Sequence, residues 1–416
     1  MCPYEKKINY IIMNLRIAWR NLWRNKKRTL ITVSLITLSV ALAVFMRSLQ
    51  EGSYARMIEN AVGSYTGYVQ VHQKDYWNDK SFDNGIVLND TLLKKIRSIK
   101  DVEGVNLRLE SFSLASYGSS TKGALILGIV PEQDTMLNIR DKIAEGSFIN
   151  ENDSSVILGA KLAEFLKISP GDTLVLLGQG HYGQSAIGAF PVKGIAKIPA
   201  PDLDRQVVFM PLKLAQEYFS FPDGATSIVV LFNDPDETSL IADELNAALD
   251  TTMYKAMTWQ EMTPEMVSMI NSDRAGGIVM IAILYMIIAF GVFGTVLMMT
   301  EERKREFAIL VAIGTQKTKL SAVAFYETIM MNSIGVAIGI VITIPIVLYF
   351  LYYPMTMTGK EAESFEKLGI EPIMPTILSS MIFLHQILVI LSISLIAFIY
   401  PLITIMRLKI INAMRR

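Results

Sequence analysis

Four long apolar stretches interrupt an otherwise mixed pattern of hydrophobic and polar positions. They cover approximately residues 30–50, 275–299, 322–352 and 377–405. A helix needs about 20 predominantly apolar residues to cross the hydrocarbon core of a bilayer. The pattern therefore predicts four transmembrane helices, with one long mixed segment between the first and the second.

That mixed segment, residues 51–273, alternates between strand-like and helix-like patterns. Short runs rich in β-branched residues, bounded by Gly, Pro, Asp or Asn, predict strands at 66–73, 106–118, 122–130, 154–159, 171–178, 190–198, 205–211 and 226–232. Helical patterns cover 89–99, 159–167, 211–219 and 236–249. Because strands and helices mix without a strict alternating rhythm, we expect a large α+β domain.

Two further helices are expected to join this domain to the membrane. Residues 47–62 continue the first apolar stretch. Thr258 and Glu261 have the spacing of a capping box. They predict a helix that begins there and runs into the second span.

The composition agrees with a membrane protein that has one external domain. Of 416 residues, 51% are hydrophobic and 19% are charged, which is too apolar for an ordinary soluble protein and too polar for membrane helices alone. One cysteine, Cys2, excludes a disulfide framework, and the three histidines have no zinc-site spacing. The zero net charge gives no indication of a nucleic-acid partner.

The distribution of charge predicts the orientation, because cytoplasmic segments are enriched in Lys and Arg. Residues 1–29 contain eight basic residues and one acidic residue, 301–320 contain five basic residues, and the tail 406–416 contains four. The loop 353–376 instead has two basic and four acidic residues. We therefore expect both termini and the 300–320 segment in the cytoplasm, with 51–273 and 353–376 outside.

The first apolar stretch has an alternative interpretation as a cleavable signal peptide. Basic residues precede it, and Ala41, Leu42 and Ala43 resemble a cleavage site. The apolar run continues beyond that site through Val44 to Met46. This continuation favours a retained membrane span.

The sequence contains no recognisable catalytic or cofactor motif. The glycine-rich loop GQGHYGQS at 178–185 lacks the Lys-Ser/Thr ending of a phosphate-binding loop. Asp202 and Asp204 stand among prolines, which favours a turn. We predict no catalytic residue, no cofactor-binding residue and no metal ligand.

A charged segment, MTEERKREFAILVAIGTQKTKL, lies between the second and third spans at 299–320. Glu301 and Arg305 are spaced to support a helix. Phe307, Leu310 and Val311 fall on one face, and Gly314 is a suitable helix end. A short amphipathic helix of this kind suits either a groove on a partner protein or a membrane surface, and its spacing does not decide between them.

The third span contains one carboxylate and a pair of spaced glycines. Glu327 lies near its start, where it either makes a polar contact or reaches the membrane interface. Gly335 and Gly339 form a small-xxx-small pair that allows close helix approach, inside the chain or between chains.

The charged segment resembles the cytoplasmic segment of the FtsX/MacB/LolC-LolE family of ABC-transporter permeases. The family pattern E-R-x-x-E-I-x-I-L-x-A-x-G is matched here at Glu302, Arg303, Glu306, Ile309, Leu310, Ala312 and Gly314. Phe307 replaces the more usual isoleucine. Glu327, Gly335 and Gly339 also resemble the third helix of the family.

The resemblance extends over nearly the whole chain. Residues 14–32 are similar to the family's amphipathic elbow helix, which places that element within 1–29, and residues 158–177 and 190–219 look like its periplasmic domain. The tail departs from the family, because Ile410–Met414 replaces a Pro-x-Glu-Ala-Leu element.

The resemblance implies a role for the charged segment as a coupling helix that docks on an ATPase. Its residues would be Glu302, Arg303, Glu306, Phe307, Leu310, Val311 and Gly314. The expected partners are an ABC ATPase subunit in trans, a second permease copy that is identical or paralogous, and the lipid bilayer of a bacterial inner membrane. The chain itself is then not an enzyme, and ATP is bound by the partner.

In this family, ATP-driven movement is passed through the membrane to the external domain. The nearest family function is lipoprotein release, with a lipoprotein substrate and a lipoprotein carrier. One alternative is MacB-like export of peptides or small molecules with a membrane-fusion protein. Another is FtsX-like signalling to a cell-wall hydrolase, although the external domain of that branch is usually smaller.

Overall fold

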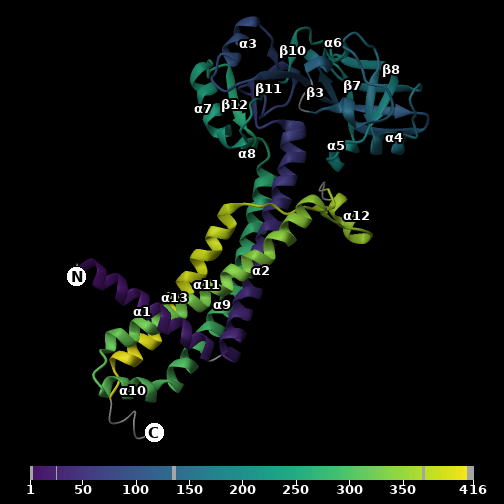
Figure 1. Ribbon diagram of the computed structural model, residues 1–416. Coiled ribbons are helices and arrows are strands. Elements are labelled where there is room, and N and C mark those ends of the chain that lie inside the picture. Colours follow the sequence, from purple (N-terminus) through teal and green to yellow (C-terminus); the bar gives the residue numbers. More distant parts are fainter. Residues whose placement is uncertain (1–2, 25, 134–136, 368–370, 410–416) are drawn as a thin grey trace. The chain divides into compact units, whose positions relative to one another are not determined.

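A computed structural model describes residues 3–24, 26–133, 137–367 and 371–409 (Figure 1). The chain forms two compact units. The helical unit comprises Met1–Tyr54, Ile270–Thr356 and Ile373–Arg416. The α/β unit comprises Ala55–Met269 and Met357–Pro372.

The helical unit is built from long apolar helices and two shorter ones. Their bounds are α1 (Pro3–Arg24), α2 (Lys26–Ile58), α9 (Pro264–Glu302), α10 (Lys304–Ala312), α11 (Lys317–Tyr352) and α13 (Ser380–Met406). Within the described residues, four helices are long and apolar enough to cross a membrane, and they contain α2, α9, α11 and α13. The four predicted spans are confirmed, and the protein is a membrane protein.

Buried aliphatic side chains from all four spans form the core of this unit. On α2 and α9 they recur four residues apart, as an inward-facing stripe requires. The cluster consists of Ile36, Val40, Val44, Ile288, Val292, Val296, Val336, Ile390 and Ala397.

The two glycines of α11 lie against α2. A Cβ atom built on Gly335 would lie 2.8 Å from Cβ of Ile36, and one on Gly339 would lie 2.9 Å from Cβ of Val40. The hydroxyl of Thr37 also donates a hydrogen bond of 3.1 Å to the carbonyl oxygen of Gly335. This small-residue contact is therefore made inside the chain.

The α/β unit contains one large mixed sheet, with strand order β12-β1-β11-β3-β4-β9-β6-β8-β5 and with β7 paired to both β3 and β8. Strands β4 and β9 are parallel, as are β6 and β8, and the other pairs of this sheet are antiparallel. The strands are β1 (Val69–Gln73), β3 (Gly104–Tyr117), β4 (Ser120–Ile129), β5 (Ile143–Gly146), β6 (Val156–Gly159), β7 (Thr173–Gln179), β8 (Ser185–Ala196), β9 (Val207–Pro211), β11 (Ser227–Leu231) and β12 (Tyr254–Thr258).

Short helices and two small ladders complete the architecture. The helices are α3 (Asp90–Arg97), α4 (Ala160–Leu166), α5 (Pro201–Asp204), α6 (Leu212–Tyr218), α7 (Thr238–Ala248), α8 (Trp259–Met262) and α12 (Lys360–Lys367). The ladders pair β2 (Ile86–Val87) with β10 (Gly224–Ala225), and β13 (Met355–Thr356) with β14 (Ile373–Met374). Every strand and helix predicted from the strand-like and helix-like patterns between 66 and 249 forms, so the α+β prediction is confirmed.

Asp204 has a structural role that the sequence did not reveal. The prediction of a turn at Asp202 and Asp204 is replaced by the short helix α5, and Asp204 is only 3% exposed. Its carboxylate accepts hydrogen bonds from the backbone N–H groups of Ala160 (3.0 Å), Ile198 (3.0 Å) and Lys161 (3.2 Å). It therefore caps the start of α4, where backbone N–H groups have no partner in the helix.

The helix that was predicted to begin at Thr258 and run into the second span is interrupted. The capping box of Thr258 and Glu261 forms, as predicted. However, α8 ends after one turn, because Thr263 has non-helical dihedral angles (φ −127°, ψ 60°) and Pro264 begins α9. Proline lacks the N–H needed to continue a helix and is favoured at the first position of a new one.

Strands β3, β7 and β8 are apolar on both faces. One face is buried in the core, whereas Phe112, Leu114, Val175, Leu177 and Ile187 are 43–68% exposed on the other. Leu114 pairs with Leu177, which pairs with Ile187, so these side chains share one side of the sheet. We call these five residues the outer apolar face.

Candidate functional site

The charged segment begins with a helix break of a single residue. Arg303 lies between α9 and α10, with φ −90° and ψ 0°. Its N–H donates a hydrogen bond of 3.3 Å to the Met299 carbonyl oxygen, and its own carbonyl oxygen accepts one of 2.9 Å from Phe307. The backbone of Arg303 is therefore bonded to both helices.

The end of α10 is a glycine cap. Gly314 has φ +100°, a conformation that side chains disfavour. The N–H of Thr315 donates to the carbonyl oxygen of Leu310 (2.9 Å), and that of Gly314 donates to Val311 (3.1 Å). These two bonds form a Schellman motif, so the predicted helix end at Gly314 is confirmed.

The two sides of α10 differ from the predicted arrangement. Phe307 and Ala308 are buried in a cluster with Leu320, Ile405 and Leu408, and Val311 packs against the same cluster. Phe307 and Val311 thus face inward, although we expected them to share an outward face with Leu310. Periodicity groups residues on a helix, but the side that meets the core depends on contacts distant in sequence.

The outward apolar residues of α10 are Ile309, Leu310 and Ile313. Their side chains are 45%, 36% and 74% exposed. We call these three residues the α10 surface. Ile313 lies just after the last helical residue, and sequence reasoning did not select it, although its position one turn after Ile309 is a usable signal.

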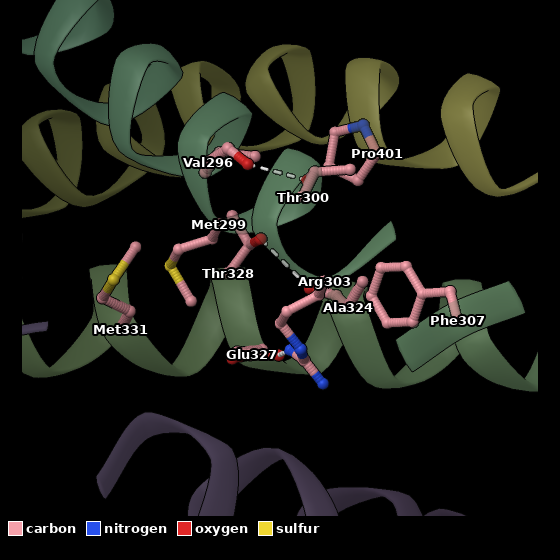
Figure 2. A pocket seen from close by; sticks show the side chains of 10 residues that line it. All are labelled: Val296, Met299, Thr300, Arg303, Phe307, Ala324, Glu327, Thr328, Met331 and Pro401. Carbon is pink, nitrogen blue, oxygen red and sulfur yellow. Dashed lines mark hydrogen bonds and ion pairs between the residues drawn. The ribbon is translucent and has the colours of Figure 1, made fainter. Parts of the chain in front are cut away.

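Glu327 makes a buried ion pair with Arg303 (Figure 2). Its Oε2 lies 2.6 Å from Nη1 of Arg303, and Glu327 is 4% exposed. The guanidinium carbon lies 5.0 Å from the centre of the Phe307 ring, within cation–π range. Of the two interpretations of Glu327, the structure supports the polar contact.

The pair lines a cavity of about 20 Å³. The remaining lining comes from α9, α10, α11 and α13, as Figure 2 shows. These residues are Val296, Met299, Thr300, Phe307, Ala324, Thr328, Met331 and Pro401. The ends of four helices thus meet around one buried charge pair.

Further ion pairs surround this centre and are more exposed. Glu306 lies 2.7 Å from Arg24 of α1 and 3.6 Å from Arg303. Glu302 pairs with Arg28 of α2. Arg24 and Arg28 are two of the eight basic residues of 1–29 that predicted the orientation, and nothing in their local sequence indicates these partners.

The structure brings five of the ten predicted site residues to this centre or to the ion pairs around it. Glu302, Arg303, Glu306, Phe307 and Glu327 lie in this centre, whereas Gly335 and Gly339 serve the separate contact with α2. The unusual tail element at 410–414 lies outside the described residues. In the described part of the chain, no group of three or more His, Cys, Asp or Glu residues could hold a metal ion.

Two family descriptions match the sequence. Residues 29–248, more than half of the chain, match the MacB-like periplasmic core domain. Residues 278–410 match the FtsX-like permease C-terminal region. The chain belongs to the MacB/FtsX permease family. The charged centre and α10 both fall within its FtsX-like part.

Relatives of this family are distant in sequence. The macrolide export ATP-binding/permease protein MacB of Nitrobacter winogradskyi is 24% identical over 346 residues, which cover 79% of this chain and 51% of that protein. The pyoverdine export ATP-binding/permease protein PvdT of Pseudomonas aeruginosa is 24% identical over 361 residues, covering 79% and 50%. The chain thus spans about half the length of these relatives.

Among solved structures, the periplasmic region of MacB from Actinobacillus actinomycetemcomitans matches with a TM-score of 0.36. The sequence identity is 14%, and the match covers 51% of this chain and 97% of that one.

Proposed function

We propose that this chain is a membrane subunit of an ABC transporter and that the α10 surface binds an ABC ATPase. The observation that supports this most directly is the outward exposure of Ile309, Leu310 and Ile313 on a helix whose other side is packed and which has ion-paired residues at its N-terminal end. Short helices with exposed apolar residues bind grooves on partner proteins.

The ion pairs favour a protein partner over a membrane surface for α10. An interfacial helix attracts lipid headgroups through free basic residues on its polar face. In α10, Lys304 is paired with Glu301 at 2.7 Å, and Glu306 adds negative charge beside the exposed Arg305. Because these charges are largely compensated, we expect the α10 surface to bind a partner mainly through its apolar side chains.

Co-purification from native membranes tests this function. The tagged chain is extracted in mild detergent, and every retained protein is identified by mass spectrometry. We expect an ABC ATPase with the unmodified chain, and about tenfold less of it with Leu310→Asp or Ile313→Asp, since a charge in an apolar contact costs more than about 1.4 kcal/mol.

Thr318→Asp is the matched control. It adds the same charge to an exposed residue on the other side of Gly314, and it should leave the ATPase yield unchanged. Equal retention of the ATPase by all variants, or no ATPase with the unmodified chain, would show that the proposed docking is wrong.

We further propose that ATP is hydrolysed by this partner in trans, and that two permease copies, identical or paralogous, work together in a bacterial inner membrane. The names of the relatives mention export, which favours export of an amphiphilic substrate. Lipoprotein release and FtsX-like signalling are the competing versions. A co-purified lipoprotein carrier, membrane-fusion protein or cell-wall hydrolase would distinguish them.

A further inference from the structure

Arg303 and Glu327 form an ion pair that differs from its neighbours in burial. Their side chains are 11% and 5% exposed, whereas those of Arg24 and Glu306 are 54% and 49% exposed. Exposed ion pairs contribute little to stability, but removing one partner of a buried pair leaves an uncompensated charge. Among the ion pairs around α10, this one is therefore the hardest to break.

The position of Arg303 connects three helices at one residue. Its backbone N–H is bonded to α9 and its carbonyl oxygen to α10, while its side chain is bonded to Glu327 of α11. Arg303 therefore links α9, α10 and α11 directly.

We propose that the Arg303–Glu327 ion pair is the joint through which movement of α10 reaches α11, which makes both residues positioning residues for ATP-driven transport. The inference rests on the proposed function, since it requires an ATPase that acts on α10. It goes further by assigning the step after docking to one pair of side chains.

The geometry of the pair allows the two side chains to stay bonded while their relative orientation changes. Oε2 of Glu327 accepts the hydrogen bond from Arg303, and Oε1 has no hydrogen-bond partner among the residues that the structure describes. The pair borders the 20 Å³ cavity beside Thr300 and Thr328. A contact through one oxygen is less restrictive than a bidentate pair, so the guanidinium can change its angle without leaving the carboxylate.

The contacts on either side of the joint support this direction of transmission. Towards α10, the Phe307 ring lies beneath the guanidinium and is part of a buried cluster. Towards the membrane, α11 contacts α2 closely at Gly335 and Gly339. Glu327 thus lies on a packed route from the α10 surface to the core of the spans.

The test measures movement of α11 in the complete complex. The full chain, with its co-purified ATPase, is placed in nanodiscs after Cys2→Ser. Tyr352→Cys then provides one exposed thiol at the last residue of α11, where the native side chain is 75% exposed. The rate of maleimide labelling is measured with and without Mg-ATP.

We expect Mg-ATP to change the labelling rate in this reference protein. Glu327→Gln should still retain the ATPase and hydrolyse ATP, but the nucleotide-dependent change should fall about fivefold or more, the range of a typical coupling between sites. The charge-swapped double variant, Arg303→Glu with Glu327→Arg, should restore most of the response. Arg303→Lys, which keeps one charged donor, should lie between.

Arg24→Gln is the matched control, because it also breaks one ion pair of α10 but an exposed one. It should leave the response within about twofold of the reference. Thermal unfolding of each variant checks its folding, and the double variant and Arg303→Lys decide the question if Glu327→Gln does not fold.

Several results would overturn the inference. One is an unchanged labelling response in Glu327→Gln, and another is the absence of any nucleotide response in the reference protein. A third is loss of the ATPase from Glu327→Gln without rescue by the double variant, which would show that the ion pair only stabilises the fold. If the unmodified chain retains no ATPase, the proposed function fails first. If the unmodified chain retains the ATPase and Leu310→Asp loses it, the proposed function stands. An unchanged labelling response in Glu327→Gln then contradicts this inference alone.

Discussion

His72 illustrates how burial controls a single residue. It lies on β1, is 2% exposed, and its ring stacks on Tyr76 with centroids 5.3 Å apart. Its Nδ1 lies 3.1 Å from the Thr226 carbonyl oxygen. Burial and the nearby Lys80 ammonium lower the pKa of His72 to about 4, against the opposing hydrogen bond, so the ring is neutral in the folded protein at neutral pH.

This lowered pKa predicts an acid-sensitive α/β unit. The unfolded state binds a proton at His72 more strongly than the folded state does. The free energy of unfolding is therefore unaffected by this group above pH 6.5 and decreases as the pH falls from 6.5 towards 4. From about pH 7 to about pH 5, His72 should account for a loss of about 2 kcal/mol in unfolding free energy. Thermal unfolding of the full chain should show a smaller pH effect with His72→Gln. An identical pH effect would contradict this account.

Asp204 gives a second prediction at the residue scale. Asp204→Ala removes the acceptor of three backbone N–H groups, and it should destabilise the chain by roughly 3 kcal/mol, about 1 kcal/mol for each lost bond. Asp202→Ala is the control, because its side chain is 63% exposed, and it should change stability by less than about 0.5 kcal/mol. Chemical unfolding measures both, and similar losses would show that capping by Asp204 is unimportant.

At the scale of elements, the contact between α2 and α11 depends on the absence of side chains. Gly335→Ala places a methyl group too close to Ile36 and should cost about 1–3 kcal/mol. Gly294→Ala in α9 is the control, because a Cβ there meets nothing within 4 Å. Thermal unfolding in detergent compares the two, and equal stability would mean that α2 and α11 separate without cost.

Two strands of the large sheet that sequence analysis missed share a physical reason. Strands β5 and β12 lie at the two ends of the large sheet's strand order, and each has a partner on one side only. Such edge strands bury fewer side chains and tend to include charged residues. Glu145 and Lys255 weaken their apolar patterns accordingly.

The candidate site was predictable in its local features but not in its long-range contacts. The helix of α10 and its end at Gly314 follow from neighbouring residues. The partner of Glu327 lies 24 positions away in the sequence, and Arg24 lies 282 positions from Glu306. No spacing rule relates residues at such separations, so these pairs required the structure.

For the whole molecule, the charge distribution of the connecting segments predicts a definite orientation. After Cys2→Ser removes the native thiol, Ser220→Cys should react with an impermeant maleimide in intact cells, and Gln316→Cys should react only after lysis. Both positions are exposed, so a difference in labelling reports sidedness. The reverse pattern would show that the predicted orientation is wrong.

The outer apolar face of β3, β7 and β8 affects how the protein behaves after extraction from the membrane. Detergent monomers bind to exposed apolar side chains of a soluble sheet for the same reason that they coat membrane helices. In each case the binding removes apolar surface from water. The purified chain should therefore bind more detergent than its spans require. On dilution of the detergent, association should begin at this face as well as at the spans, and Ile187→Ser should delay it.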